Sequence, residues 1–206
     1  QICDEVSERA SLCKSVNTIT FSDNKIFGDS TDGRGLVSDL KNKNINIKDK
    51  SILLVGAGGA ANGVIYDLVQ SKPKQILLTN RTFIKAIKMK DYWEKFSDKH
   101  KVIIKPIDLK YSHKINFDLI INATSASITS NDSPITAATF NFLNIKGACY
   151  DMMYGAETPF MKCAFKKTNA VHNGLGMLIE QAAVSFNIWH QVKPTTIKVG
   201  ELLKSL

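Results

Sequence analysis

The chain has 206 residues, 44% of them hydrophobic, so it is long enough to bury a substantial core in one large domain or slightly more. Its formal charge of +8 comes from 27 basic and 19 acidic residues, and the lysines are scattered rather than grouped with aromatic residues. This pattern argues against a nucleic-acid partner and suits an anionic small molecule. No apolar run approaches the length of a membrane span, so we expect no membrane partner.

The four cysteines predict neither a metal site nor a redox motif. Cys3, Cys13, Cys149 and Cys163 show no C-x-x-C spacing and have no pair of histidines beside them. Two of the four lie in apolar segments, as buried reduced thiols do, which favours a cytoplasmic protein.

The first part of the chain predicts a helix, a hairpin and a second helix. Charged residues over 4–10 indicate the first helix, and the start at Gln1 without a methionine suggests a fragment that lacks an N-terminal part. Residues 15–21 alternate as a strand does, a turn follows at 22–24, and 25–27 return as a second strand. Polar residues then open a helix whose apolar positions include Leu36 and Leu40.

The most informative motif follows the apolar run at 51–55. Gly56-Ala57-Gly58-Gly59-Ala60 predicts a tight turn between a buried strand and a helix, with backbone N–H groups available to a pyrophosphate. A second apolar strand at 75–79 completes the βαβ unit that a dinucleotide site requires. Some glycine turns of this kind only pack a helix on a sheet, but this context favours a nucleotide.

The end of the second strand favours NADP over NAD. An NAD site usually has an acidic residue there, whereas this chain has Asn80, Arg81, Thr82 and then Lys85. Arg81 can clamp a 2′-phosphate bidentately, and Thr82 can donate its hydroxyl. The alternative is that Arg81 and Lys85 are ordinary surface residues at the start of a helix.

The remaining chain continues to alternate between strands and helices. We expect strands near 102–104, 117–122, 148–152 and 168–171, and helices over 175–190 and 196–206. Strands separated by helices predict an α/β fold with a doubly wound parallel sheet, a Rossmann-type NADP-binding domain.

Polar clusters stand where such a sheet binds ligands, at strand ends or at the start of a helix. They are Asn17-Thr18, Thr31-Asp32-Gly33, Asn122–Ser125, Tyr150–Gly155 and Asn173–Met177. With the glycine motif and N-R-T, the sequences V-N-T-I, T-D-G, N-A-T-S, D-M-x-Y and G-L-G-M-L-x-x-Q-A resemble the shikimate dehydrogenase family. The resemblance covers essentially the whole chain, in order and with consistent spacing.

The resemblance implies an enzyme that reversibly reduces 3-dehydroshikimate to shikimate with NADP. It implies that Asp32 is catalytic, pairing with a lysine and binding a substrate hydroxyl, and that Asn17, Tyr154 and Gln181 also bind substrate. An alternative for Asp32 is that it only caps its helix. The residues implied to bind the cofactor are Glu8, Gly56, Ala57, Gly58, Gly59, Ala60, Asn80, Arg81, Thr82, Lys85, Thr124, Met152 and Gly174.

The family's catalytic lysine lies in a segment reading roughly T-x-P-x-K, and neither this segment nor the Ser-rich carboxylate-binding element occurs here. We therefore expect this chain alone to bind cofactor but to be inactive. The sequence also departs from the family at Ser30, which replaces an Asn before T-D-G. Two alternatives stay open: a quinate/shikimate dehydrogenase and a non-catalytic nucleotide-binding module.

The resemblance also implies a division of the chain. Residues 1–34 would be the end of the substrate domain and the hinge, 35–190 the Rossmann NADP-binding domain, and 191–206 a C-terminal helix that returns towards the substrate domain. We expect a monomer or homodimer.

Overall fold

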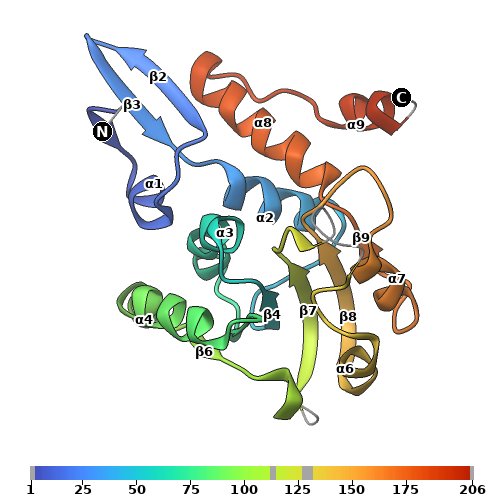
Figure 1. Ribbon diagram of the computed structural model, residues 1–206. Coiled ribbons are helices and arrows are strands. Elements are labelled where there is room, and N and C mark those ends of the chain that lie inside the picture. The colour runs from blue at the N-terminus through green and yellow to red at the C-terminus, as the bar shows by residue number, and fades with distance from the viewer. Residues whose placement is uncertain (1–2, 112–114, 127–131, 205–206) are drawn as a thin grey trace.

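The computed structural model describes residues 3–111, 115–126 and 132–204. Figure 1 shows a small sheet at one end of the molecule and a larger sheet flanked by helices. The small sheet has three strands in the order β1-β3-β2, in which β1 is parallel and β2 antiparallel to β3. Its strands are β1 (Glu5–Val6), β2 (Thr18–Ser22) and β3 (Lys25–Asp29). Helix α1 (Glu8–Cys13) lies between β1 and β2 in the chain, and α2 (Asp32–Asn42) follows β3.

The larger sheet has six parallel strands in the order β6-β5-β4-β7-β8-β9. Its strands are β4 (Ser51–Val55), β5 (Gln75–Thr79), β6 (Ile103–Pro106), β7 (Asn116–Asn122), β8 (Asn144–Asp151) and β9 (Val171–His172). The strand order reverses between β4 and β7, and a doubly wound sheet binds ligands at this point. The predicted fold class, a doubly wound Rossmann-type α/β fold, is confirmed.

The helices that connect these strands are α3 (Gly59–Gln70), α4 (Phe83–Lys99), the 3-10 turn η1 (Leu109–Tyr111), α6 (Ala137–Phe142) and α7 (Pro159–Phe165). After β9 come α8 (Leu175–His190) and α9 (Ile197–Lys204). Among the described residues, no helix is long and apolar enough to cross a membrane.

Each face of the six-stranded sheet has its own apolar core. Along β4, Ile52 and Leu54 pack with residues of α2, α3 and α4, whereas Leu53 and Val55 pack with residues of α6 and α7. Successive side chains of a strand point to opposite faces, so a continuous apolar run is needed where both faces are covered. This explains why the strand reads as an unbroken run of hydrophobic residues.

The prediction of a helix over residues 4–10 is partly wrong. Glu5 and Val6 form strand β1, paired with Phe27 and Gly28, and the helix begins only at Glu8. The side chain of Ser7 accepts a hydrogen bond from the backbone N–H of Ala10 and so caps the helix. Backbone pairing with β3 overrides the helical tendency of the charged residues.

Candidate active site

The glycine turn, Gly56–Ala60, connects β4 to α3. Gly56 has a φ of +113°, a conformation that L side chains rarely adopt, so this position requires glycine. Gly58 is the N-cap of α3, whose first turn has no acidic residue and no side-chain cap. A Cβ added at Gly58 or Gly59 would meet no atom within 4 Å. The turn therefore offers an open helix N-terminus, which fits the pyrophosphate of a dinucleotide.

Asn80 connects the glycine turn to the start of α4. Its Oδ1 accepts the backbone N–H of Ala57 at 3.2 Å, and its Nδ2 donates to the carbonyl oxygen of Thr82 at 3.0 Å. Arg81, Thr82 and Lys85 follow on the exposed surface, and the side chain of Thr82 makes no capping hydrogen bond. Asn80 thus holds the start of α4, with the residues predicted to bind the 2′-phosphate, beside the turn expected to bind pyrophosphate.

Thr124 lies against the glycine turn from the next strand. A Cβ on Gly56 would stand 3.0 Å from Cγ2 of Thr124. The Thr124 hydroxyl donates to Oδ1 of Asn122 at 2.8 Å, and Nδ2 of Asn122 donates to Oδ1 of Asp151 at 2.9 Å. Asp151 is fully buried, and burial raises the pKa of its carboxyl group above the ordinary value. Asn122 and Asp151 therefore fix the ends of β7 and β8 at this edge of the sheet.

Met152 and Gly174 meet through their backbones. The N–H of Gly174 donates to the carbonyl oxygen of Met153 at 2.8 Å. A Cβ at Gly174 would lie 2.1 Å from the carbonyl oxygen of Met152, a distance that no side chain tolerates. The glycine lets the start of α8 pack directly on the end of β8, which places both cofactor candidates together.

The substrate candidates form a second group, the amide–carboxylate group of Asn17, Asp32 and Gln181. Nδ2 of Asn17 donates to Oδ1 of Asp32 at 2.8 Å and lies 3.4 Å from Oε1 of Gln181. Burial raises the pKa of Asp32 above its ordinary value, and the hydrogen bond from Asn17 acts in the opposite direction. Thr31, not Asp32, is the N-cap residue of α2.

This group lies beside the helix that follows the glycine turn. A Cβ at Gly63 would stand 3.5 Å from Oδ2 of Asp32, so the carboxylate reaches α3 about one turn, or roughly 6 Å, beyond Gly59. In Figure 1, α2 lies between α8 and α3 and so brings the two groups together. A cofactor on the turn and a small ligand on Asp32 would be neighbours.

Two predicted site residues stand apart from these groups. Glu8 accepts a hydrogen bond from the hydroxyl of Tyr66 at 2.9 Å, in the second half of α3 and about two turns from Gly59. Tyr154 is 52% exposed, and no hydrogen bond joins it to the amide–carboxylate group in the described part of the chain. Their assignments to cofactor and substrate stay predictions.

Asn62 has a role that the sequence motif did not indicate. Its Nδ2 donates to the carbonyl oxygen of Cys13 at 2.5 Å, and its Oδ1 accepts from Nε1 of Trp93 at 2.7 Å. Asn62 thus joins the first turn of α3 to both α1 and α4. The signal for this role in the sequence is a polar asparagine among the glycine, alanine and valine residues that begin α3.

Ser30, at which the sequence departs from the family pattern, makes no hydrogen bond with its side chain among the described residues. This side chain is fully buried. Asp32 is nevertheless held, because its partner is Asn17.

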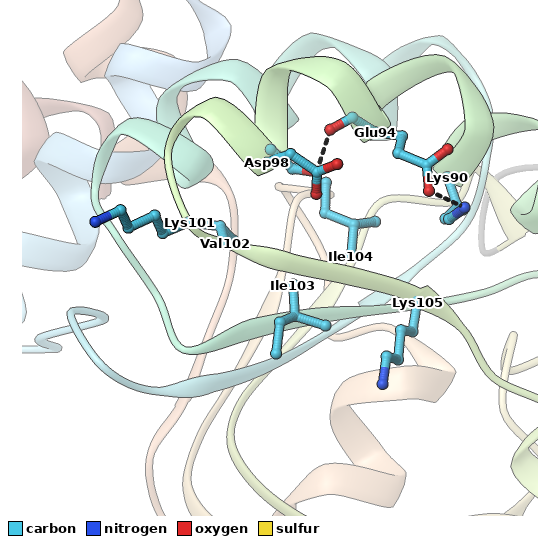
Figure 2. A pocket seen from close by; sticks show the side chains of 9 residues that line it. Lys90, Glu94, Asp98, Lys101, Val102, Ile103, Ile104 and Lys105 are labelled. Atoms are coloured by element: carbon cyan, nitrogen blue, oxygen red, sulfur yellow. Dashed lines mark hydrogen bonds and ion pairs between the residues drawn. The ribbon is translucent and has the colours of Figure 1, made fainter.

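A surface depression of about 380 Å³ lies between α4 and β6, at the edge of the larger sheet. Figure 2 shows that its charged residues come from α4, from the turn after α4, where Lys101 lies, and from β6, and that Lys90 pairs with Glu94. Neither the glycine turn nor Asp32 lines it. We therefore place the candidate site at the strand ends and not in this depression.

Two glycines of the candidate site, Gly58 and Gly174, allow an effect on cofactor binding to be separated from an effect on stability. Gly58→Ala is expected to leave stability nearly unchanged, because the Cβ meets open space and the φ of −104° suits alanine. The methyl group would displace a bound pyrophosphate and weaken NADP binding by roughly 10-fold, the effect of mild overpacking. Titration calorimetry measures the affinity.

Gly174→Ala provides the contrast. The added Cβ would meet the backbone of Met152, so we expect the variant to unfold at a lower temperature. Its free energy of unfolding should fall by roughly 1–3 kcal/mol. Thermal unfolding of both variants checks this. A Gly58→Ala variant that binds NADP as the wild type does would contradict the role of the turn.

The comparisons with known proteins agree with this geometry. The family model for shikimate / quinate 5-dehydrogenase matches residues 39–136, and the model for the shikimate 5′-dehydrogenase C-terminal domain matches residues 174–196. Shikimate dehydrogenase (NADP(+)) of Colwellia psychrerythraea is 45% identical over 207 residues, which cover 99% of this chain and 72% of that protein.

Solved structures share the fold. Shikimate 5-dehydrogenase of Thermus thermophilus, in complex with NADP(H) and shikimate, superposes with a TM-score of 0.84 at 27% identity, over 98% of this chain and 72% of that one. The Ael1 enzyme of Pseudomonas putida gives a TM-score of 0.85 at 31% identity, over 98% of this chain and 72% of that enzyme. The chain spans about 72% of the length of these relatives. It belongs to the shikimate dehydrogenase family.

Proposed function

We propose that this protein is an NADP-dependent shikimate dehydrogenase, which reversibly reduces 3-dehydroshikimate to shikimate in the pathway to chorismate and the aromatic amino acids. One observation carries this function: the half-buried carboxylate of Asp32 lies against α3, about one turn from the open glycine turn. Bound NADP supplies or accepts the hydride. The names of the 45% identical relative and of the NADP(H)–shikimate complex support the choice of substrate and cofactor.

The chain's own residues then have distinct tasks. Asp32 accepts a hydrogen bond from a substrate hydroxyl and orients the group that protonates the developing alkoxide. Asn17 and Gln181 bind the hydroxyls of the ring from the same side, and Tyr154 approaches from the loop after β8.

A separate set of residues holds the cofactor. The backbone N–H groups of the glycine turn hold the pyrophosphate, and Arg81, Thr82 and Lys85 hold the 2′-phosphate. Met152 and Gly174 border the nicotinamide, and Thr124 lies against the cofactor.

We also propose that residues 1–34 end a substrate domain and include its hinge, that 35–190 form the Rossmann domain, and that 191–206 return towards the substrate domain. Two contacts near the C-terminal end connect these proposed parts. Nε1 of Trp189, near the end of α8, donates to the carbonyl oxygen of Ile19 on β2 at 2.9 Å. Helix α9 packs on α8, with Gly200 facing Ile179. The function fits a cytoplasmic monomer or homodimer.

Residues 1–206 alone should bind NADP without oxidising shikimate. Among the described residues, Asp32 forms no ion pair with a lysine or an arginine, the kind of partner that would serve as the general acid. Formation of NADPH from shikimate and NADP⁺ would be measured for residues 1–206 and for the complete gene product, including any segment encoded ahead of Gln1.

The complete gene product should be active on shikimate and the 206-residue chain should not. Steady turnover by residues 1–206 would show that a lysine of this chain serves as the acid. A complete gene product that binds NADP but oxidises neither shikimate nor quinate would favour a non-catalytic nucleotide-binding module. A preference for quinate would identify a quinate/shikimate dehydrogenase.

A further inference from the structure

Three buried hydroxyl groups lie directly behind the amide–carboxylate group. This hydroxyl cluster consists of Thr18 at the start of β2, Thr31 at the N-cap of α2 and Ser185 on α8, which are 1%, 0% and 6% exposed. Oγ of Ser185 lies 2.7 Å from Oγ1 of Thr18 and 3.2 Å from Oγ1 of Thr31. A single serine of α8 thus contacts both segments that carry Asn17 and Asp32.

The hydroxyl cluster determines which way the Asn17 amide faces. Oδ1 of Asn17 accepts the backbone N–H of Thr31 at 3.0 Å and lies 3.0 and 3.1 Å from the hydroxyls of Thr18 and Thr31. These donors saturate the amide oxygen, so the NH₂ group must face outward, where it donates to Asp32.

The hydrogen-bond donors and acceptors of the Gln181 amide can be assigned in the same way. Its Oε1 lies 3.1 Å from the Thr31 hydroxyl and 3.4 Å from Nδ2 of Asn17, and its Nε2 donates to the carbonyl oxygen of Leu178. One N–H of Gln181 is left over for a ligand. Each hydroxyl has a single proton, so Thr18 and Thr31 can each donate to only one amide oxygen. Ser185 can donate to the hydroxyl of Thr18, to that of Thr31 or to the backbone carbonyl oxygen of Gln181, which lies 3.1 Å away.

We propose that Ser185, acting with Thr18 and Thr31, is a positioning residue that holds the amides of Asn17 and Gln181 with their oxygens inward and their N–H groups towards the substrate. The inference rests on the proposed function and deepens it. The site then has amide donors and, in Asp32, a carboxylate acceptor. It selects a ligand whose hydroxyl groups both accept from the amides and donate to the carboxylate.

Helix stability does not explain a serine at this position. A serine that donates to the carbonyl four residues earlier slightly destabilises and bends a helix. The neighbours on α8 are apolar, namely Ala182, Ala183, Val184 and Phe186. Besides the backbone carbonyl of Gln181, the hydroxyl of Ser185 contacts Thr18 of β2 and Thr31 at the start of α2, which lie 167 and 154 residues away in the sequence.

The test uses the complete gene product and the variants Ser185→Ala and Thr18→Val. Each removes one hydroxyl and little volume. We expect the kcat/KM for shikimate to fall roughly 3- to 10-fold, the effect of losing one neutral hydrogen bond, with a higher KM for shikimate and an unchanged KM for NADP. Thr18→Ser keeps the hydroxyl and should restore the wild-type values.

Ser97→Ala is the matched control. Ser97 is also a buried helical serine, 2% exposed, and its Oγ donates to the carbonyl oxygen of Glu94 at 3.0 Å, on α4. It should change thermal stability about as much as Ser185→Ala while leaving both KM values unchanged.

Wild-type kinetics for shikimate in Ser185→Ala and Thr18→Val would overturn the positioning role alone. So would equal losses for shikimate and NADP, because these would indicate a general structural effect. A wild-type protein that does not oxidise shikimate would overturn the proposed function, and this inference with it.

Discussion

Asp32→Asn is expected to lower kcat of the complete gene product by about 10²- to 10⁴-fold, the usual contribution of acid–base catalysis. The substitution keeps the shape of the side chain and removes its charge. If the carboxylate orients both the proton donor and the substrate hydroxyl, the loss falls mainly on the chemical step. Steady-state kinetics with shikimate and NADP⁺ measure it.

Binding of NADP should not change in this variant, because Asp32 forms no hydrogen bond with the glycine turn or with Asn80 in the described structure. Asp118→Asn is a suitable control: Asp118 accepts the N–H of Ser51 at 2.9 Å, at the opposite ends of β4 and β7 from the site. It should keep normal turnover.

The alternative of a purely capping role makes a different prediction. Thr31 is the N-cap of α2, and the carboxylate of Asp32 accepts from Asn17. A merely structural Asp32 would tolerate asparagine with little loss of rate. A folded Asp32→Asn protein that binds NADP and keeps near-normal kcat would therefore remove Asp32 from the catalytic residues.

Arg81→Ala is expected to weaken NADP binding by roughly 10- to 100-fold while barely changing NAD binding. A charge-assisted hydrogen bond to a phosphate contributes about 1.5–3 kcal/mol, which converts to this range. Arg81 lies exposed at the start of α4 and forms no ion pair within the described ranges. Its guanidinium is therefore available to the 2′-phosphate.

Titration calorimetry on residues 1–206 measures the two affinities directly. Lys85→Ala should show a smaller loss than Arg81→Ala, since an ammonium group lacks the bidentate geometry. Lys88→Ala, an exposed lysine further along α4, should show none. Equal affinities of the wild-type chain for NADP and NAD would rule out the phosphate role of Arg81.

Some elements of the larger sheet and its helices could be predicted closely from the sequence, whereas β8 begins at Asn144, four residues before the strand predicted at 148–152. The strand predicted at 75–79 and the helix predicted at 175–190 have the bounds of β5 and α8. Both have strong local signals: an apolar run between turns, and a helix that opens on Gly174. The strand predicted at 168–171 is instead the two-residue β9, Val171–His172, at the edge of the sheet. Edge strands depend on one neighbour, so local sequence defines them weakly.

By itself, the sequence determined the chemical groups of the candidate site: the glycine turn, Arg81 in place of an acid, and Asp32 after a predicted strand. These signals lie within a few neighbouring residues, and backbone geometry makes them recognisable. Only the tertiary structure decided which groups meet. Ser185 reaches Thr18, Asp32 reaches α3, and Glu8 reaches Tyr66 instead of the glycine turn. Such contacts join residues far apart in sequence, and they depend on how α2, α3 and α8 pack, which no local pattern encodes.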